Sequence, residues 1–176
     1  MYKNFLIVVD EGAVARAAMQ EGLELARTHA ARVVFFHVLP NYVMPIADAP
    51  PLVYMSPEEH RKDVERLAKR LLASAAAQAK RLGIESTGAV GSHSDAATCI
   101  ANAALERHCD LIVIGSHGRS PMQRLIFGSI VTRLIQLSAV PLLVCKAAER
   151  SRATQTPRPS DPQVPQSEDL PIGDAA

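Results

Sequence analysis

The chain has 176 residues, of which 48% are hydrophobic and 4% aromatic, and its 19 basic and 18 acidic residues give a net charge of +1. This length is typical of one domain, and the scarcity of aromatic residues predicts a core of aliphatic side chains. The balanced charge excludes the strong basic field with which proteins attract nucleic acid, so no nucleic-acid partner is expected.

The start of the chain and its cysteines bear on its location. The apolar stretch 5–9 is too short for the core of a signal peptide and ends at Asp10. No stretch approaches the roughly 20 apolar residues of a membrane span. The cysteines Cys99, Cys109 and Cys145 match neither a disulfide framework nor a metal-binding spacing. We therefore expect a cytoplasmic protein with reduced thiols and no membrane partner. No pair of His, Cys or carboxylate residues has the spacing of metal ligands, so no metal-binding residue is predicted.

Five apolar runs of strand length alternate with segments of helical period. They span residues 5–9, 33–39, 84–90, 111–114 and 142–145. Continuous aliphatic runs are typical of strands that are covered on both faces. The third run alternates weakly and contains Gly88, so we expect it at an edge of the sheet.

Four segments between these runs carry apolar residues at the i, i+3, i+4, i+7 spacing of an amphipathic helix. They span residues 13–29, 57–82, 95–107 and 128–137. Ser56 before Pro57, with Glu59 three positions after the serine, predicts a capping box at the start of the second helix. Ser94 is expected to cap the third helix rather than to belong to a catalytic triad.

The alternation of strands and helices predicts βαβ units and hence an α/β fold. Right-handed crossovers then give a doubly wound, five-stranded parallel sheet of order 3-2-1-4-5 with helices on both faces. This domain is expected over residues 1–146. Five of the twelve prolines fall between residues 157 and 171, among polar residues with little to bury, so residues 147–176 are expected to form a disordered tail.

A ligand site is expected where the strand order reverses, between the carboxyl ends of the first and fourth strands. The first strand ends at Asp10 and the fourth at Gly115, and Gly118 and Gly128-Ser129 follow. Glycines let the backbone approach an anion closely, and the amides at the start of a helix attract phosphate. The Ser129 hydroxyl adds a hydrogen-bond donor. These features predict a phosphate-binding loop between Gly115 and Ser129.

Charged side chains add to this loop. Arg119 and Arg124 can offset phosphate charge, and Asp10 can accept hydrogen bonds from a ribose hydroxyl. No general base with an orienting partner is evident. We therefore expect a nucleotide-binding protein that is not an enzyme, with at most slow hydrolysis of ATP.

The pattern Gly-x2-Gly-x9-Gly-Ser, after a strand ending Asp-Leu-Ile-Val-Ile, resembles the nucleotide-binding signature of the universal stress protein family. The likeness covers nearly all of residues 1–146, including His37-Val38 and Val140-Pro141. It implies an adenine nucleotide alpha hydrolase-like (Rossmann-like) fold, a role in the stress response, and ATP with Mg²⁺ as ligand, with AMP as an alternative.

The resemblance also implies which residues contact the nucleotide. The base would lie against Val8 and the backbone of Val38, and the ribose against Asp10. The nucleotide-binding residues expected in this way, together with the loop arginine, are Val8, Asp10, Val38, Ile114, Gly115, Gly118, Arg119, Gly128, Ser129 and Ile130.

The first loop departs from the family pattern. Members commonly have Asp-Gly-Ser after the first strand, whereas this chain has Asp10-Glu11-Gly12. The Glu11 carboxylate can either repel phosphates or help to hold Mg²⁺, and the sequence leaves both open. It also motivates an alternative function, a stress-response interaction protein with a non-functional nucleotide pocket.

Other nucleotide and signalling proteins fit less well. A P-loop requires a lysine before the serine that Gly128-Ser129 lacks, and a receiver domain requires an aspartate where this chain has Val90-Gly91. An adenylate-forming or flavin-linked enzyme would need a Ser-Gly-Gly-x-Asp-Ser pattern that is absent from the first loop.

The last predicted strand is apolar on both faces although it is expected at a sheet edge. It comprises Leu142, Leu143, Val144 and Cys145, with no charge before Lys146. Such an edge invites pairing with another chain, and a two-fold homodimer closes it. The family resemblance implies the same dimer.

Overall fold

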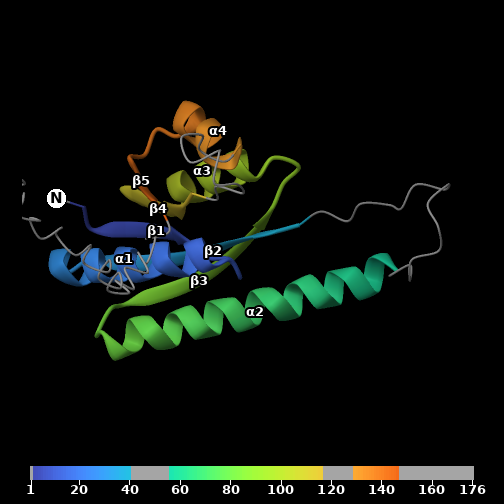
Figure 1. The fold of residues 1–176 in the computed structure, drawn as a ribbon, viewed down its shortest axis with the longest axis horizontal. Coiled ribbons are helices and arrows are strands. Elements are labelled where there is room, and N and C mark those ends of the chain that lie inside the picture. The colour runs from blue at the N-terminus through green and yellow to red at the C-terminus, as the bar shows by residue number, and fades with distance from the viewer. Residues whose placement is uncertain (1, 41–55, 117–128, 147–176) are drawn as a thin grey trace, which may run out of the picture.

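A five-stranded parallel sheet lies between two layers of helices in the computed structural model, which describes residues 2–40, 56–116 and 129–146 (Figure 1). The elements in chain order are β1 (Asn4–Val8), α1 (Ala13–His29), β2 (Arg32–Leu39), α2 (Pro57–Arg81), β3 (Ser86–Ser92), α3 (Ala96–Glu106), β4 (Leu111–Gly115), α4 (Ser129–Leu137) and β5 (Leu142–Cys145). The strand order is β3-β2-β1-β4-β5 and every pair is parallel. The predicted fold class and strand order are confirmed.

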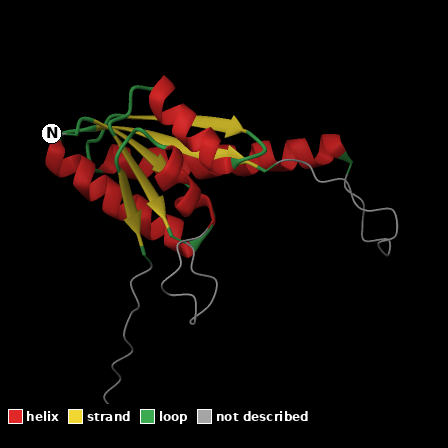
Figure 2. Ribbon diagram, turned by 90° about the horizontal axis from the view of Figure 1, so that it is seen from above, coloured by secondary structure: helices red, strands yellow, loops and turns green. Residues whose placement is uncertain are grey.

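The strand arrows fan apart in Figure 2, as the right-handed twist of a parallel sheet requires. The α1 and α2 helices cover one face, and α3 and α4 cover the other (Figure 1). Along β1, Phe5 and Ile7 point toward α1 and α2, while Leu6 points toward α3 and α4. All three are fully buried, because both faces of this strand are covered.

Four of the five predicted strands differ from the observed ones at their ends; β2 begins one residue earlier, at Arg32, and β4 ends one residue later, at Gly115. The β1 strand runs over Asn4–Val8, one residue earlier than expected, although the Val9 amide still donates to the Phe36 carbonyl at 2.9 Å. The β3 strand begins at Ser86 rather than at Ile84. The Ile84 amide is unavailable to the sheet because it donates to the Ala79 carbonyl (2.9 Å) and closes α2 after Gly83, which has a φ of +70°.

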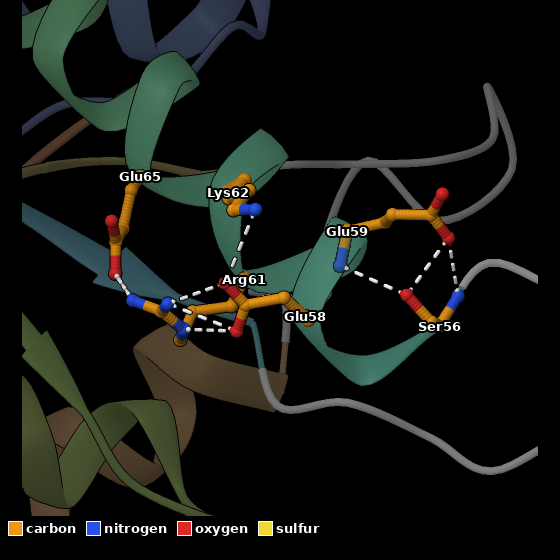
Figure 3. A network of polar contacts seen from close by, with 6 residues as sticks. All are labelled: Ser56, Glu58, Glu59, Arg61, Lys62 and Glu65. Carbon is orange, nitrogen blue, oxygen red and sulfur yellow. Dashed lines mark hydrogen bonds and ion pairs between the residues drawn. The ribbon is translucent and has the colours of Figure 1, made fainter.

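The start of α2 confirms the predicted capping box (Figure 3). The Ser56 amide donates to the Glu59 carboxylate at 2.8 Å, and the Glu59 amide donates to the Ser56 hydroxyl at 3.2 Å. One turn further on, Arg61 pairs with Glu58 and Glu65, both at 2.9 Å. These side chains are exposed, so the pairs contribute little to stability.

The start of α3 corrects the sequence-based prediction. The N-cap is Asp95 and not Ser94, and its Oδ1 accepts a hydrogen bond from the Ala97 amide at 3.3 Å. Serine and aspartate are comparable caps, so propensity does not separate them. Contacts to Thr98 and Arg133 favour Asp95, and one of these residues lies on another helix.

Several predictions fall on residues that the structure does not describe. They concern the tail of residues 147–176 and the loop residues Gly118, Arg119, Arg124 and Gly128. Among the helices that are described, none combines the length and apolar character needed to cross a membrane.

Candidate functional site

The candidate site lies at the switch point of the sheet, between the neighbouring strands β1 and β4. From β1 the chain continues to β2 on one side of this point, and from β4 it continues to β5 on the other side. Three of the predicted residues lie at the carboxyl ends of the neighbouring strands β1, β2 and β4: Val8 is the last residue of its strand, and Val38 and Ile114 are the last but one of theirs. All three belong to the apolar cluster beneath α3 and α4 and thus share one face of the sheet. Val8 and Val38 are half-buried, whereas Ile114 is buried. The arrangement offers a partly open apolar surface of the kind that packs against a flat ring.

Gly115, at the end of β4, is held close to the start of α1. A Cβ atom at this position would lie 2.9 Å from the Val14 carbonyl oxygen and 3.0 Å from the Ala15 nitrogen. Both atoms belong to backbone, so no rotamer change relieves the contact. The absence of a side chain therefore lets the first turn of α1 lie against the switch point, a packing reason for this glycine that the sequence does not reveal.

The start of α1 faces the same region without a side-chain cap. Its N-cap is Gly12, which makes no side-chain hydrogen bond to the first turn, whereas α2 and α3 are capped by Ser56 and Asp95. The first amides of a helix carry positive partial charge and lack partners within the helix. These amides are not among the site residues predicted from the sequence, although the glycine before the helix is a usable signal.

Asp10 lies two residues after the end of β1 and is exposed. Its Oδ1 accepts a hydrogen bond from the Glu11 amide at 2.7 Å, which orients the carboxylate beside the turn that leads into α1. Glu11, the next residue in the chain, is exposed too, so the turn into α1 carries two exposed acidic residues.

The start of α4 presents the predicted residues Ser129 and Ile130, both exposed. Val131 and Leu134 lie on the face of α4 that packs against the sheet, where they are buried and anchor the helix in the core. Arg133 donates through Nε to Asp95 Oδ2 at 2.6 Å, and this pair ties α4 to the start of α3.

Asp95 also accepts a hydrogen bond from the Thr98 hydroxyl at 2.6 Å. The hydrogen bonds from Thr98 and Arg133 lower the pKa of Asp95 from its usual value of 3.8 to about 2. The folded protein therefore binds this proton less readily than the unfolded chain. The stability contributed by Asp95 is fully present above about pH 4 and is lost as the pH falls toward 2.

We expect Asp95→Asn to unfold more readily than the native protein at pH 7, with the difference shrinking between pH 4 and 2. Urea unfolding at a series of pH values measures this. Asp63→Asn is the matched control, because Asp63 pairs with Arg66 at 3.1 Å on the exposed face of α2. It should change stability little at any of these pH values. Equal pH dependence in native protein and Asp95→Asn would contradict the prediction.

Metal ligation and thiol reactivity both bear on the chemistry of the described residues. No group of three His, Cys, Asp or Glu side chains among them is placed to hold a metal ion. All three cysteines are free, and burial raises the pKa of each thiol, in Cys109 to about 11. Protonated thiols are weak nucleophiles.

Sequence comparison relates the chain to the universal stress proteins. The sequence model of the universal stress protein family matches residues 1–146. The universal stress protein YxiE of Bacillus subtilis is 26% identical over 149 residues, which cover 83% of this chain and all of that protein. The universal stress protein Sll1654 of Synechocystis is 28% identical over 144 residues, or 82% of this chain and 85% of that protein.

Several solved structures have the same fold as this chain. A universal stress protein family member from Burkholderia pseudomallei superposes with a TM-score of 0.65 at 24% identity, covering 81% of this chain and 95% of that one. The universal stress protein of Archaeoglobus fulgidus was solved in complex with dAMP (TM-score 0.59, 21% identity, 82% and 98% covered). An Arabidopsis thaliana family member was solved with AMP bound (TM-score 0.58, 14% identity, 82% and 91% covered). At these identities the likeness shows the Rossmann-like fold.

Proposed function

The chain belongs to the universal stress protein family, and we propose that it binds an adenine nucleotide at the carboxyl ends of β1, β2 and β4. The observation that carries the proposal is the shared face of Val8, Val38 and Ile114, beside the closely packed end of β4 at Gly115. The dAMP and AMP complexes of proteins with the same fold support the ligand class.

The proposed binding mode assigns one part of the nucleotide to each element. The base lies on Val8 and the backbone of Val38, and Asp10 accepts hydrogen bonds from the ribose. The phosphates extend from Gly115 toward Ser129 and the amide of Ile130, both exposed at the start of α4. Gly118, Arg119 and Gly128 complete this phosphate site on the basis of the sequence alone.

ATP with Mg²⁺ is the proposed physiological ligand. Magnesium is held in proteins by one or two carboxylates together with phosphate oxygens. The exposed neighbours Asp10 and Glu11 fit that requirement. When bound, the ion would neutralise phosphate charge, and Glu11 would then favour binding instead of opposing it.

We assign the protein a regulatory role in the stress response, in the cytoplasm, without efficient catalysis. Among the described residues, His37 is the buried histidine nearest to Asp10 in sequence. Its Nδ1 is hydrogen-bonded to a backbone carbonyl. Its Nε2 is buried and so out of reach of a water at a phosphate, and His37 is therefore not placed as a general base. Slow hydrolysis of ATP fits a site that binds phosphates without such a base.

The direct test is to heat-denature freshly purified protein and identify released nucleotides by chromatography. Calorimetric titration with AMP, with ATP and with Mg-ATP follows. We expect a released adenine nucleotide or a measurable affinity that Mg²⁺ changes for ATP. No release and no affinity for ATP, ADP or AMP would overturn the proposal and favour the second candidate, an interaction protein whose pocket is disabled by Glu11.

We further propose a two-fold homodimer through β5. This strand lies at the edge of the sheet, and its four residues are half-buried. The Ile112 and Ser116 amides donate to the Pro141 and Cys145 carbonyls, so alternate residues of β5 face β4. The backbone groups of Leu142 and Val144 therefore point outward, where a second chain can pair with them.

Sedimentation velocity at micromolar concentration should show a dimer, and Val144→Pro should shift it to monomer because proline removes an outward-facing N–H. Val90→Pro is the matched control. The Val33 amide donates to the Glu85 carbonyl, so by alternation Val90 has its outward N–H on β3, at the opposite edge. The control should remain dimeric, and a native monomer would refute this interface.

A further inference from the structure

We propose that His37 is a positioning residue of the nucleotide site, which fixes the backbone after β1 and so sets where the Asp10 carboxylate meets the ribose. The inference rests on the proposed function, because it assigns the placement of Asp10 within that same site.

The geometry of His37 links two neighbouring strands. The side chain is 6% exposed, and its Nδ1 lies 2.8 Å from the carbonyl oxygen of Val9. Because a carbonyl oxygen only accepts hydrogen bonds, Nδ1 must carry the proton. Val9 also donates its amide to the Phe36 carbonyl at 2.9 Å. Both polar backbone groups of Val9 are thus bonded to β2, one residue beyond the end of β1.

The Val9 carbonyl belongs to the peptide unit that contains the Asp10 nitrogen. A peptide unit is planar, so a hydrogen bond that holds this oxygen also fixes the direction in which the chain enters Asp10. Val9 is 4% exposed and Asp10 is exposed, so the chain leaves the core at this peptide. The Asp10 carboxylate is then oriented by the Glu11 amide. The imidazole therefore holds the planar peptide between Val9 and Asp10, which connects the buried sheet to the proposed ribose contact.

The second ring nitrogen of His37 indicates that the residue does more than stabilise the fold. Its Nε2 is buried and has no hydrogen-bond partner among the described residues. With the proton on Nδ1, Nε2 is an acceptor that has lost its water, and this cost offsets the gain from the Val9 bond. An aliphatic side chain would avoid the cost. The distinctive contribution of the imidazole is the direction of one hydrogen bond.

The test compares His37→Leu with His37→Asn. Asparagine carries an N–H donor at the δ position, where the imidazole has Nδ1, whereas leucine has none. Calorimetry with AMP should show about tenfold weaker binding to His37→Leu, as expected for a charged hydrogen bond that is misplaced. His37→Asn should restore most of the affinity. Thermal unfolding of both variants checks that they are folded.

Two further measurements show whether His37 acts through Asp10. In a double-mutant cycle, His37→Leu should weaken AMP binding much less when Asp10 is already alanine. With 2′,3′-dideoxyadenosine monophosphate, which lacks the ribose hydroxyls, His37→Leu and native protein should bind alike. In the protein without nucleotide, the Asp10 and Glu11 amides should exchange hydrogen faster in His37→Leu than in His37→Asn.

Equal AMP affinity of native protein and His37→Leu would overturn the inference and leave the proposed function standing. A loss that is the same with the dideoxy nucleotide, or that adds fully to the loss of Asp10→Ala, would overturn it as well. If native protein binds no adenine nucleotide, the proposed function fails and the role of His37 in the site fails with it. Unchanged exchange at Asp10 would refute the positioning step itself.

Discussion

Gly115→Ala is expected to lower the free energy of unfolding by about 3 kcal/mol and to weaken nucleotide binding. The new Cβ would lie 2.9 Å from the Val14 carbonyl oxygen and 3.0 Å from the Ala15 nitrogen. Overpacking of a core costs about 1–3 kcal/mol, and the upper end applies because backbone atoms cannot turn aside. The first turn of α1 must shift, and the turn that carries Asp10 shifts with it. Urea unfolding and AMP calorimetry measure the two effects.

Gly22→Ala provides the matched control for Gly115→Ala. Gly22 is buried on α1, and a Cβ there would lie 2.8 Å from Ile7 Cδ1 and 3.2 Å from Val113 Cγ1. These atoms are ends of side chains and can move. Alanine also favours a helix interior over glycine by about 1 kcal/mol, so the net change should lie within about 1 kcal/mol of zero. Equal losses in both variants would contradict the backbone-contact explanation.

Gly118→Asp is expected to abolish nucleotide binding while leaving the fold intact. Gly118 lies outside the described residues, so the expectation rests on its place in the Gly-x2-Gly-x9-Gly-Ser pattern. A carboxylate in a phosphate-binding loop places like charges side by side, which costs several kcal/mol, and each 1.4 kcal/mol corresponds to about tenfold in affinity. We therefore expect a loss of more than about a hundredfold in calorimetry with AMP and ATP.

The control for Gly118→Asp adds the same charge elsewhere. Gln136→Glu lies on the exposed last turns of α4, away from the start of that helix. Its affinity should match that of the native protein within about twofold, because water and salt screen an exposed charge. Circular dichroism and thermal unfolding confirm that both variants are folded. If Gly118→Asp binds as tightly as the native protein, the glycine pattern is not the phosphate site.

Local sequence patterns predicted the elements and much of their ends. The α1 bounds and those of β5 agree with the prediction, and the capping box at Ser56 was predicted from three residues. Such features depend on hydrogen bonds and periodicity within one element, which a short stretch of sequence encodes. The errors fall where a neighbouring element decides. Ile84 closes α2 instead of starting β3, and Arg133 on α4 binds Asp95 at the start of α3.

Part of the candidate site was also predictable, because its location follows from the order of the elements along the chain. The strand order and the rule that ligands bind beyond strand carboxyl ends placed Asp10 and Gly115 together. The family resemblance named Val8, Val38 and Ile114, and the structure shows that they share one face. The division of the chain at residue 146 stays a prediction, and so do the roles of all the nucleotide-binding residues, Gly118, Arg119 and Gly128 among them.

The sequence by itself determined the order of strands and helices, the doubly wound sheet and the location of the switch point. Only the tertiary structure showed that Gly115 is packed against Val14, or that His37 holds the Val9 carbonyl. The physical reason is distance along the chain. Periodicity and capping act over a few residues, whereas these contacts join separate elements whose approach is set by the packing of the whole core.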